Sequence, residues 1–351
     1  MLSAQPHYLF ITRLLIDLYH AGELPNVAQL EIEPVYGYVG RIVYHDGSVR
    51  LFRGTHVGVN DNGASEISRD KGYTKYFLQQ LGYQTAPWRI FLLPRYHQQV
   101  QRNLSRFGVT EYPVISDIEA YIASIGGYPC YIKPNDESQG KGVYKCYDAD
   151  GLQIALTEYQ RERYNTIIVE QNVPYPDYRV VMYAGEVIAC YLRRPLTVIG
   201  DGEASIATLL NRKQSLFEAA GRPVLLNLDD PRITKKLAHA GYTLASIPAP
   251  EVAIAVYDAA NLSTGGDAQD VTEQLHPQWA ARCAALTAQM GLKLCGVDLA
   301  CADIANPDAP YSIIETNAAP GLDNYATLGA PQLARVRALY QRIFNQPHSL
   351  F

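Results

Sequence analysis

A glycine-rich loop directly after a short apolar strand is the feature that most constrains this chain. The strand ends in Lys133-Pro134, and the loop occupies residues 138–142. Glycines let backbone N–H groups approach an anion closely and lysines add positive charge, so such a segment is suited to holding a polyphosphate. The spacing fits neither a Walker A motif nor a dinucleotide-binding fingerprint. Taken alone, the loop is also compatible with a plain surface turn.

Segments with helical and strand-like patterns alternate along most of the chain, which predicts an α+β fold built from α/β layers. The first part is different, because residues 35–44 and 49–53 flank Asp46-Gly47, a turn typical of a β-hairpin. We therefore expect a short hairpin-containing N-terminal domain at residues 1–66.

The remaining chain divides into two larger subdomains in our prediction, at residues 67–168 and 169–351, with a polar, turn-rich lid inserted at about 200–265. The first begins with a helix that has Ser68 as its N-cap and Gly82 as its stop. Further helices are expected at 116–125, 152–163, 205–214, 231–240, 278–290 and 331–344, and strands at 166–171, 178–183, 187–193, 294–300 and 311–317.

The composition excludes several functional classes. The net charge of −5, with 48% apolar and 19% charged residues, is typical of a globular protein and argues against sequence-independent nucleic-acid binding, which needs basic clusters. No run of eighteen apolar residues occurs, so no membrane-spanning helix is expected. The six cysteines include no Cys-x-x-Cys pair and favour free thiols in a reducing cytoplasm.

Two strand segments near the C-terminus carry a candidate metal site. Glu315 and Asn317 lie two residues apart on one strand, so their side chains share a face, and Asp298 on a neighbouring strand can complete the set. Carboxylate and amide oxygens suit Mg²⁺, which commonly shares nucleotide phosphates. The alternative is that each residue only caps the end of its strand.

Two arginines on one predicted hairpin form a second candidate group. Arg179 begins the first strand and Arg193 ends the second, so both can hold a phosphate or carboxylate in bidentate geometry. Alternatively, they are solvated hairpin ends. The turn at residues 261–267 offers amides and hydroxyls to a substrate carboxylate, although alone it is only a loop. The dispersed histidines give no hydrolase pattern.

Taken in order, these motifs resemble the ATP-grasp superfamily of carboxylate–amine ligases. The resemblance is strongest to the ATP-grasp domains of cyanophycin synthetase and of bifunctional glutathione-synthesising enzymes, and it covers roughly residues 60–345. The segments that carry it are Asp70-Lys71-x-x-Thr74, Lys133 to Val143, Glu170, Asp177-Tyr-Arg179, Arg193-x-Pro195, Asn261 to Gly266, Gly296-Val-Asp298 and Glu315-x-Asn-Ala-Ala-Pro-Gly321.

The resemblance implies ATP and Mg²⁺ as cofactors, with ATP in a cleft between two α+β subdomains. It also implies a role for each matching residue. The residues expected to contact the nucleotide are Lys71, Lys133, Ser138, Gln139, Gly140, Gly142, Glu170, Gln171, Val173 and Asp177. Of these, Glu170, Gln171 and Val173 are expected to lie against the adenine. Catalytic residues are Arg179, Arg193 and Lys141; substrate contacts are Ser263, Thr264, Gly265, Gly266 and Asn324; metal ligands are Asp298, Glu315 and Asn317.

The implied function is an ADP-forming ligase that joins a carboxylate of an amino acid or small peptide to an amine. A ligase for a peptide or protein tail, a small-molecule kinase and a non-catalytic nucleotide-binding module are the alternatives. Two departures change the expected substrates: the chain ends just after the ATP-grasp module, without the second ligase domain of cyanophycin synthetase, and Gly321-Leu-Asp-Asn-Tyr325 replaces the basic residue and histidine expected there. By analogy, a homodimer is expected, with no nucleic-acid or membrane partner.

Overall fold

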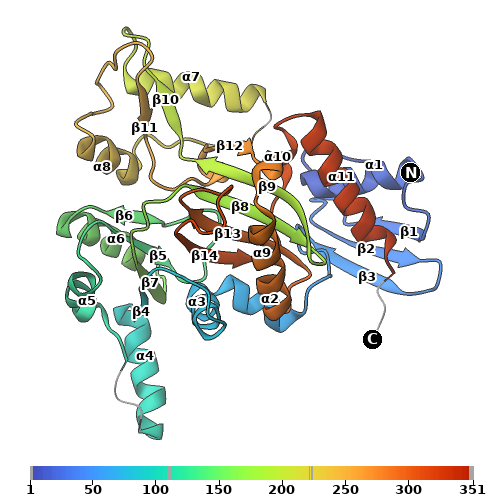
Figure 1. The fold of residues 1–351 in the computed structure, drawn as a ribbon, viewed down its shortest axis with the longest axis horizontal. Coiled ribbons are helices and arrows are strands. Elements are labelled where there is room, and N and C mark those ends of the chain that lie inside the picture. Colours follow the sequence, from blue (N-terminus) through green and yellow to red (C-terminus); the bar gives the residue numbers. More distant parts are fainter. Residues whose placement is uncertain (1–2, 109–111, 221, 223, 348–351) are drawn as a thin grey trace.

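The computed structural model describes residues 3–108, 112–220, 222 and 224–347, which form four β-sheets with helices packed against them. Figure 1 shows a three-stranded sheet beside both chain ends, a five-stranded sheet in the middle, and a four-stranded and a two-stranded sheet on the far side. All strand pairs in the ladders are antiparallel. The predicted α+β class is confirmed.

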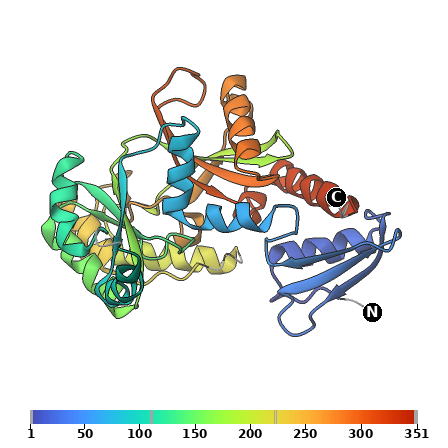
Figure 2. The ribbon, with the colours of Figure 1, turned by 90° about the horizontal axis from the view of Figure 1, so that it is seen from below.

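The N-terminal unit shares its core with the last long helix of the chain. Buried leucines of α1 and the inner face of the small sheet pack against apolar side chains of α11, and Figure 2 shows the two ends of the chain side by side. Asn26 donates a hydrogen bond to the backbone carbonyl of Asn345, and Arg50 donates to that of Ile343. The elements are α1 (Phe10–His20), β1 (Val27–Ile32), β2 (Val39–Tyr44), β3 (Val49–Arg53) and α11 (Ala330–Asn345).

The four-stranded sheet has the order β4-β7-β5-β6 and buries one face under α5 and α6. Cys130 and Ile132 of β5 point into that core, so Tyr131 and Lys133 lie on the opposite face. The elements of this part are β4 (Trp88–Leu92), α4 (Pro94–Leu104), η1 (Ser105–Phe107), η2 (Ile115–Asp117), α5 (Ile118–Ser124), β5 (Cys130–Pro134), β6 (Tyr144–Cys146), α6 (Ala149–Arg161) and β7 (Thr166–Gln171).

The five-stranded sheet has the order β12-β9-β8-β13-β14, and α9 covers one of its faces. Val180 and Val297 point into that apolar layer, so Arg179, Asp298 and Glu315 lie on the other face. The elements are β8 (Asp177–Tyr183), β9 (Glu186–Arg194), β12 (Asp267–Asp270), η4 (Thr272–Gln274), α9 (Pro277–Gln289), β13 (Leu294–Cys301), β14 (Tyr311–Asn317) and α10 (Asp323–Ala326).

The segment predicted as a lid forms a small subassembly with its own apolar core. Leu196 and Val198 pack with Ile233 and Leu237 of α8. This apolar core therefore holds the two-stranded sheet against that helix. The elements are β10 (Thr197–Ile199), α7 (Ile206–Ala219), α8 (Pro231–His239), β11 (Ala253–Ala255) and η3 (Leu262–Thr264).

The predicted hairpin around Asp46-Gly47 is confirmed, but the helix predicted from Ser68 is two helices. Ser68 lies buried inside α2 (Asn62–Arg69), and α3 (Lys71–Gln80) starts after Asp70, whose carboxylate accepts the backbone N–H of Tyr73 at 2.8 Å. Both residues are good N-caps, and Asp70 takes that role because its φ and ψ are extended.

The domain boundary predicted at residue 66 falls inside α2. The division of the chain into three domains stays a prediction. All six cysteines are buried and free. In the part of the chain that the structure describes, no helix combines the length and hydrophobicity needed to cross a bilayer.

Candidate active site

Two buried lysines share one glutamate on the face of the four-stranded sheet opposite α5 and α6. The Nζ atom of Lys133 on β5 lies 2.9 Å from Oε2 of Glu170 on β7, and the Nζ atom of Lys75 on α3 lies 3.5 Å from the same oxygen. Lys75 also donates to Oγ1 of Thr85 at 2.8 Å. Two ammonium groups against one carboxylate leave an excess positive charge, as a phosphate-binding site requires.

The electrostatics of this lysine pair are set by burial. Burial raises the pKa of Glu170, but the Lys133 and Lys75 ammonium groups outweigh it and lower that pKa to about 2. Burial lowers the pKa of Lys75, and the Glu170 carboxylate opposes it only in part. The other oxygen of Glu170, Oε1, is buried without a hydrogen-bond partner among the described residues. It is therefore available to a donor such as the amino group of adenine.

Lys71 approaches the glycine-rich loop from the start of α3. Its Nζ atom donates a hydrogen bond to the backbone carbonyl of Glu137. Asn135 fixes this arrangement, since its side chain accepts the N–H of Gly72 at 2.9 Å and donates to Asp70 at 2.7 Å. The segments around Lys71 and Lys133 therefore meet, as their proposed shared role requires.

Gln171 and Val173, predicted to contact adenine, lie at the end of β7 and in the connection to β8. The side-chain amide of Gln171 donates to the carbonyl of Ile125 at 2.7 Å, and its backbone N–H donates to the carbonyl of Pro87 at 2.9 Å. Val173 is half-buried in the connection. Both residues remain predicted adenine contacts.

The two arginines of the β8–β9 hairpin form one network with two aspartates. Arg179 holds Asp298 through two hydrogen bonds of 2.7 Å, while Nη2 of Arg193 lies 2.6 Å from Asp177 and 2.9 Å from Asp298. Burial raises the pKa of Asp298, but both guanidinium groups outweigh it and lower that pKa to about 2. Asp177 is thus the counter-ion of Arg193, and its role as a nucleotide contact stays a prediction.

The predicted metal ligands lie on one face of neighbouring strands. Asp298 pairs with Glu315 across β13 and β14, and the Asn317 amide donates to Oε1 of Glu315 at 3.3 Å. Among the described residues, nothing donates a hydrogen bond to Oε2 of Glu315 or to Oδ1 of Asn317, so both oxygens fit a hard cation. Both carboxylate oxygens of Asp298 already accept hydrogen bonds from the arginines. Its role as a metal ligand therefore stays a prediction. No cluster of three or more His, Cys, Asp or Glu suited to a metal occurs among the residues described.

The two sheets bring the lysines and the acidic strand ends into one electrostatic environment. Burial lowers the pKa of Lys133, but the carboxylates of Glu170, Glu315 and Asp177 outweigh it and raise that pKa. Glu170 belongs to the sheet of Lys133, whereas Glu315 and Asp177 belong to the five-stranded sheet. Positive and negative groups from both subdomains therefore converge.

The glycine-rich loop rests against the inserted segment. The carbonyl of Gln139 accepts the Ser263 hydroxyl at 2.9 Å, and that of Gly140 accepts Nη1 of Arg232 at 3.1 Å. A side chain at Gly140 would place its Cβ 2.0 Å from the Asn261 amide, so glycine is needed there. Ser138 accepts the N–H of Lys141 at 3.1 Å and closes the turn.

The Lys141 side chain forms no hydrogen bond or ion pair with the arginine network among the described residues, and its catalytic role stays a prediction. Its side chain is 59% exposed, and its Nζ atom lies 3.5 Å from Glu137 and 5.7 Å from the centre of the Tyr164 ring. Gln139, Gly140 and Gly142 have positive φ angles, and this tight turn directs the lysine between them outward.

The predicted substrate residues are connected by an arginine that the sequence analysis missed. Arg222 donates to Oδ1 of Asn324 at 3.2 Å and to the carbonyls of Leu262 and Gly266 at 3.0 and 2.9 Å. A Cβ at Gly266 would lie 2.6 Å from the Arg194 carbonyl, which explains the second glycine of the turn. Within the same turn, Gly265 has φ +91°, and Thr264 donates to the Asn261 carbonyl at 2.9 Å.

Acid should destabilise the protein through Glu170 and Asp298. Each carboxyl has a pKa of about 2 in the folded state, below its ordinary value, so the folded protein binds fewer protons than the unfolded chain. The stabilisation is therefore complete above about pH 4.5 and is lost as the pH falls toward 2. We expect urea unfolding to give a free energy that falls by several kcal/mol across this window, about 1.4 kcal/mol for each unit of pKa shift. A free energy of unfolding that stays constant across it would contradict the assignment.

The chain has an ATP-grasp fold. A bifunctional glutathione synthetase from Pasteurella multocida superimposes with a TM-score of 0.56 and 21% identity, over 96% of this chain and 44% of that one. No model of a known protein family matches the chain.

In sequence, the chain is homologous to cyanophycin synthetases and to bifunctional glutathione-synthesising proteins, as the motifs predicted. It is 36% identical over 216 residues to cyanophycin synthetase of Trichormus variabilis, covering 59% of this chain and 24% of the relative. It is 29% identical over 235 residues to the glutathione biosynthesis bifunctional protein of Mannheimia succiniciproducens, covering 61% and 30%. The chain thus spans less than a third of the length of these relatives.

Proposed function

We propose that this protein is an ATP-dependent carboxylate–amine ligase. A carboxylate oxygen of the donor attacks the γ-phosphorus of ATP, and the bond to the bridging oxygen breaks to release ADP. The resulting acyl phosphate is attacked by an amine, which loses a proton and displaces phosphate to form an amide. Catalysis of this kind rests on positioning and charge neutralisation, without a protein nucleophile.

The observation that carries the proposal is the contact between the two sheets at the lysine pair. Lys75 lies 3.5 Å from Glu170 and donates to Thr85, whose hydroxyl donates to the Ile313 carbonyl of β14 at 3.0 Å. A triphosphate bound between the sheets would meet Lys71, Lys75 and Lys133 on one side. On the other side it would meet the arginine network and a magnesium ion held by Glu315 and Asn317. When bound, the magnesium ion would neutralise part of the negative charge of the phosphates.

The loops around this site support a reaction that must exclude water, because acyl phosphates hydrolyse. The glycine-rich loop contacts the turn of residues 261–266 through Ser263, and Arg222 fixes that turn. A closed loop pair of this kind separates an activated carboxylate from solvent. The same turn, with Asn324, is our proposed contact surface for the substrate.

We infer that the substrates are an amino acid or a small peptide and an amine, as the names of the relatives suggest for those proteins. The altered segment after Pro320 indicates a different acceptor pocket. A homodimer and a cytoplasmic location complete the proposal; six free, buried cysteines are compatible with a reducing compartment.

A turnover assay separates this function from its alternatives. ADP release is measured with Mg²⁺ and a panel of amino acids and short peptides, with and without a second amine, and the products are identified by mass spectrometry. An amide product that requires both substrates is expected. A stable phosphorylated product would indicate a kinase, activity only on a longer peptide would indicate a tail-modifying ligase, and no ATP consumption would indicate a nucleotide-binding module.

Replacing Arg193 with lysine should reduce ATP turnover by about a hundredfold, in the range found when one charge-stabilising donor is lost. Arg193 contacts Asp177 and Asp298 together, and an ammonium group cannot reproduce that planar fork. The matched control is Arg194→Lys, because the adjacent Arg194 is exposed and its side chain hydrogen-bonds only to Gln269 among the described residues. Equal kcat values for the two variants would remove Arg193 from the catalytic group.

A further inference from the structure

One carboxylate next to the proposed substrate contacts has no partner inside the protein. Asp323 begins α10 and is half-buried, yet within the described part of the chain its carboxylate neither accepts a hydrogen bond nor lies at ion-pairing distance from a cation. The aspartates of the five-stranded sheet differ, because each is paired with a cation: Asp177 with Arg193, Asp267 with Lys213, Asp270 with Arg335 and Asp298 with Arg179. Asp323 is therefore an anionic group that is available to a ligand.

The chain before Asp323 passes directly beside the arginine network. A Cβ at Gly296 would lie 3.1 Å from the Pro320 side chain and 3.4 Å from that of Arg179, so Pro320 and the arginine lie on either side of this glycine. A Cβ at Gly321 would lie 3.3 Å from Oδ1 of Asp323. The carboxylate is thus turned back toward Gly321, near the arginine that the proposed ligase uses.

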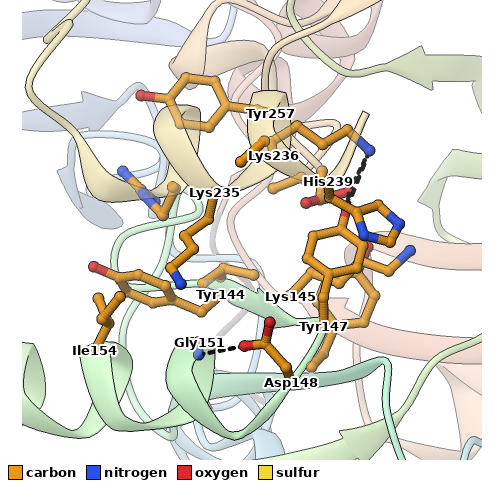
Figure 3. Close-up of a pocket in the computed structure, with 16 residues that line it drawn as sticks. Tyr144, Lys145, Tyr147, Asp148, Gly151, Ile154, Lys235, Lys236, His239 and Tyr257 are labelled. Carbon is orange, nitrogen blue, oxygen red and sulfur yellow. Dashed lines mark hydrogen bonds and ion pairs between the residues drawn. The ribbon is translucent and has the colours of Figure 1, made fainter. Parts of the chain in front are cut away.

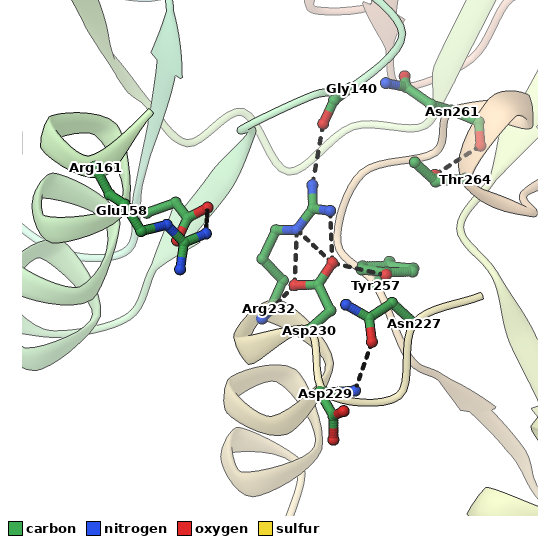
Figure 4. Close-up of polar contacts among 10 residues, drawn as sticks. All are labelled: Gly140, Glu158, Arg161, Asn227, Asp229, Asp230, Arg232, Tyr257, Asn261 and Thr264. Carbon is green, nitrogen blue, oxygen red and sulfur yellow. Dashed lines mark hydrogen bonds and ion pairs between the residues drawn. The ribbon is translucent and has the colours of Figure 1, made fainter. Parts of the chain in front are cut away.

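The residue after Asp323 connects α10 to the proposed substrate turn. Asn324 accepts Nε of Arg222, and Nη2 of the same arginine donates to two carbonyls of the turn at residues 261–266. Figure 4 shows Asn261 of this turn next to Gly140 of the glycine-rich loop. Asp323 therefore lies where the arginine network meets the substrate turn.

Arg222 does not neutralise Asp323 by direct contact. Burial lowers the pKa of Arg222, and the carboxylates of Asp267 and Asp323 oppose this. Its Nε and Nη2 atoms are used by Asn324 and the turn, and its Nη1 atom lies 3.9 Å from Asp267. The guanidinium is thus committed to holding the turn, which leaves both oxygens of Asp323 for a ligand.

The backbone that carries Asp323 is fixed before any ligand arrives. The Tyr325 ring stacks on Tyr191 with ring centres 5.1 Å apart, and its hydroxyl donates to Asp270 at 2.9 Å. Arg335 of α11 donates to the same carboxylate oxygen at 2.7 Å. These contacts hold α10 against both the five-stranded sheet and α11, so a ligand of Asp323 needs little ordering of the protein.

Asp323 is also distinct from the nucleotide side of the cleft. A pocket of about 240 Å³ lies beside β6 (Figure 3), and Tyr131, one of its lining residues, has its ring centre 5.6 Å from Nζ of Lys133. This pocket therefore belongs with the lysines that the nucleotide would meet. Among the described residues that line it, none comes from α10, so Asp323 is left to contact the substrate.

We propose that Asp323 selects an amine substrate that carries a second cationic group, as a basic amino acid or a diamine does. This inference rests on the proposed ligase function and names the substrate class of its acceptor side. The amine that attacks the acyl phosphate must be unprotonated, whereas a neighbouring carboxylate favours an ammonium group. The group that Asp323 binds is therefore a second ammonium or guanidinium, away from the reacting atoms.

Isothermal titration of the full chain, saturated with ADP and Mg²⁺, tests this preference with four matched pairs of probes. Each pair has a cationic and a neutral member: lysine and norleucine, ornithine and norvaline, arginine and citrulline, putrescine and butylamine. In at least one pair, the cationic probe should bind at least about tenfold more tightly, equivalent to about 1.4 kcal/mol. Asp323→Asn should reduce that preference to within about twofold and leave the affinity for the neutral probe unchanged.

Two further variants control this measurement. Asp323→Glu keeps the carboxylate and should keep the preference for the cationic probe. Asp308→Asn removes an exposed aspartate in the connection between β13 and β14, whose carboxylate likewise accepts no hydrogen bond among the described residues. This change should leave every affinity within about twofold. In turnover with the preferred acceptor, Asp323→Asn should raise KM by about tenfold with kcat nearly unchanged, since Asp323 contacts a part of the substrate that does not react.

The outcomes separate this inference from the ligase function itself. A cationic preference that is missing in every pair, or that persists in Asp323→Asn, would overturn the proposal. Equal weakening of cationic and neutral probes in Asp323→Asn would indicate a structural role and would overturn it as well. The titration does not depend on turnover, so it stays interpretable if no ligase activity is found. Ligation of neutral amines only would disprove the role of Asp323 and leave the ligase function standing.

Discussion

Glu315→Ala and Asn317→Ala are each expected to reduce ATP turnover by about a thousandfold, through the loss of several kcal/mol of charge neutralisation at the phosphates. Both side chains are half-buried and contact each other at 3.3 Å, while their outer oxygens have no partner among the described residues. Their removal therefore leaves the apolar layer under α9 intact. The measurement is kcat for ADP release at saturating Mg²⁺, together with thermal unfolding.

The control for this pair is Glu186→Ala, which removes an exposed carboxylate paired with Arg342 at the hairpin end. Surface ion pairs contribute little, so both activity and stability should remain near those of the unmodified protein. Normal turnover in Glu315→Ala or Asn317→Ala would show that the magnesium assignment is wrong. Loss of turnover accompanied by a large fall in the unfolding temperature would indicate a structural role instead.

Glu170→Gln is expected to lower the free energy of unfolding by about 3–5 kcal/mol, as found when one partner of a buried ion pair is removed. Lys75 and Lys133 are 1% and 8% exposed, and a neutral amide leaves both ammonium groups without a counter-charge. Urea unfolding at neutral pH measures the change, and an unaltered m value would show that the folded and unfolded states keep their compactness.

The matched control for this substitution is Glu158→Gln on α6, where the partner Arg161 has a side chain that is 70% exposed. That change should cost less than about 1 kcal/mol. If Glu170→Gln were equally mild, the lysine pair would not depend on Glu170 for its charge balance, and the low pKa assigned to that carboxyl would be wrong.

The residues that sequence reasoning located best belong to strands with strong alternation. The two-residue spacing of Glu315 and Asn317 and the hairpin that carries Arg179 and Arg193 fix which side chains share a face. Their partners are set by strand order, which a single sequence does not contain. Asp177 illustrates this, because its pairing with Arg193 depends on the register between β8 and β9.

The residues that were missed depend on tertiary contacts. Lys75 lies four positions after Lys71 on α3 and looks like a solvent-facing lysine, but the four-stranded sheet buries it beside Glu170. Arg222 is an isolated cation in a turn-rich segment, and its role requires Gly266 and Asn324 to meet it. Lys141 points outward because its neighbours in the turn have positive φ angles. The glycines in the sequence suggest such angles, but they do not tell in which direction the lysine side chain points.

The shared core of α1 and α11 has a consequence for synthesis of the chain. The ribosome makes the apolar stripe of α1 about 300 residues before the helix that covers it, a delay of roughly 15–60 s at ordinary elongation rates. During that interval the apolar side chains of α1 are exposed to solvent in the nascent chain. We therefore expect chaperones to hold the first sixty residues until α11 has been synthesised, rather than early folding of this segment.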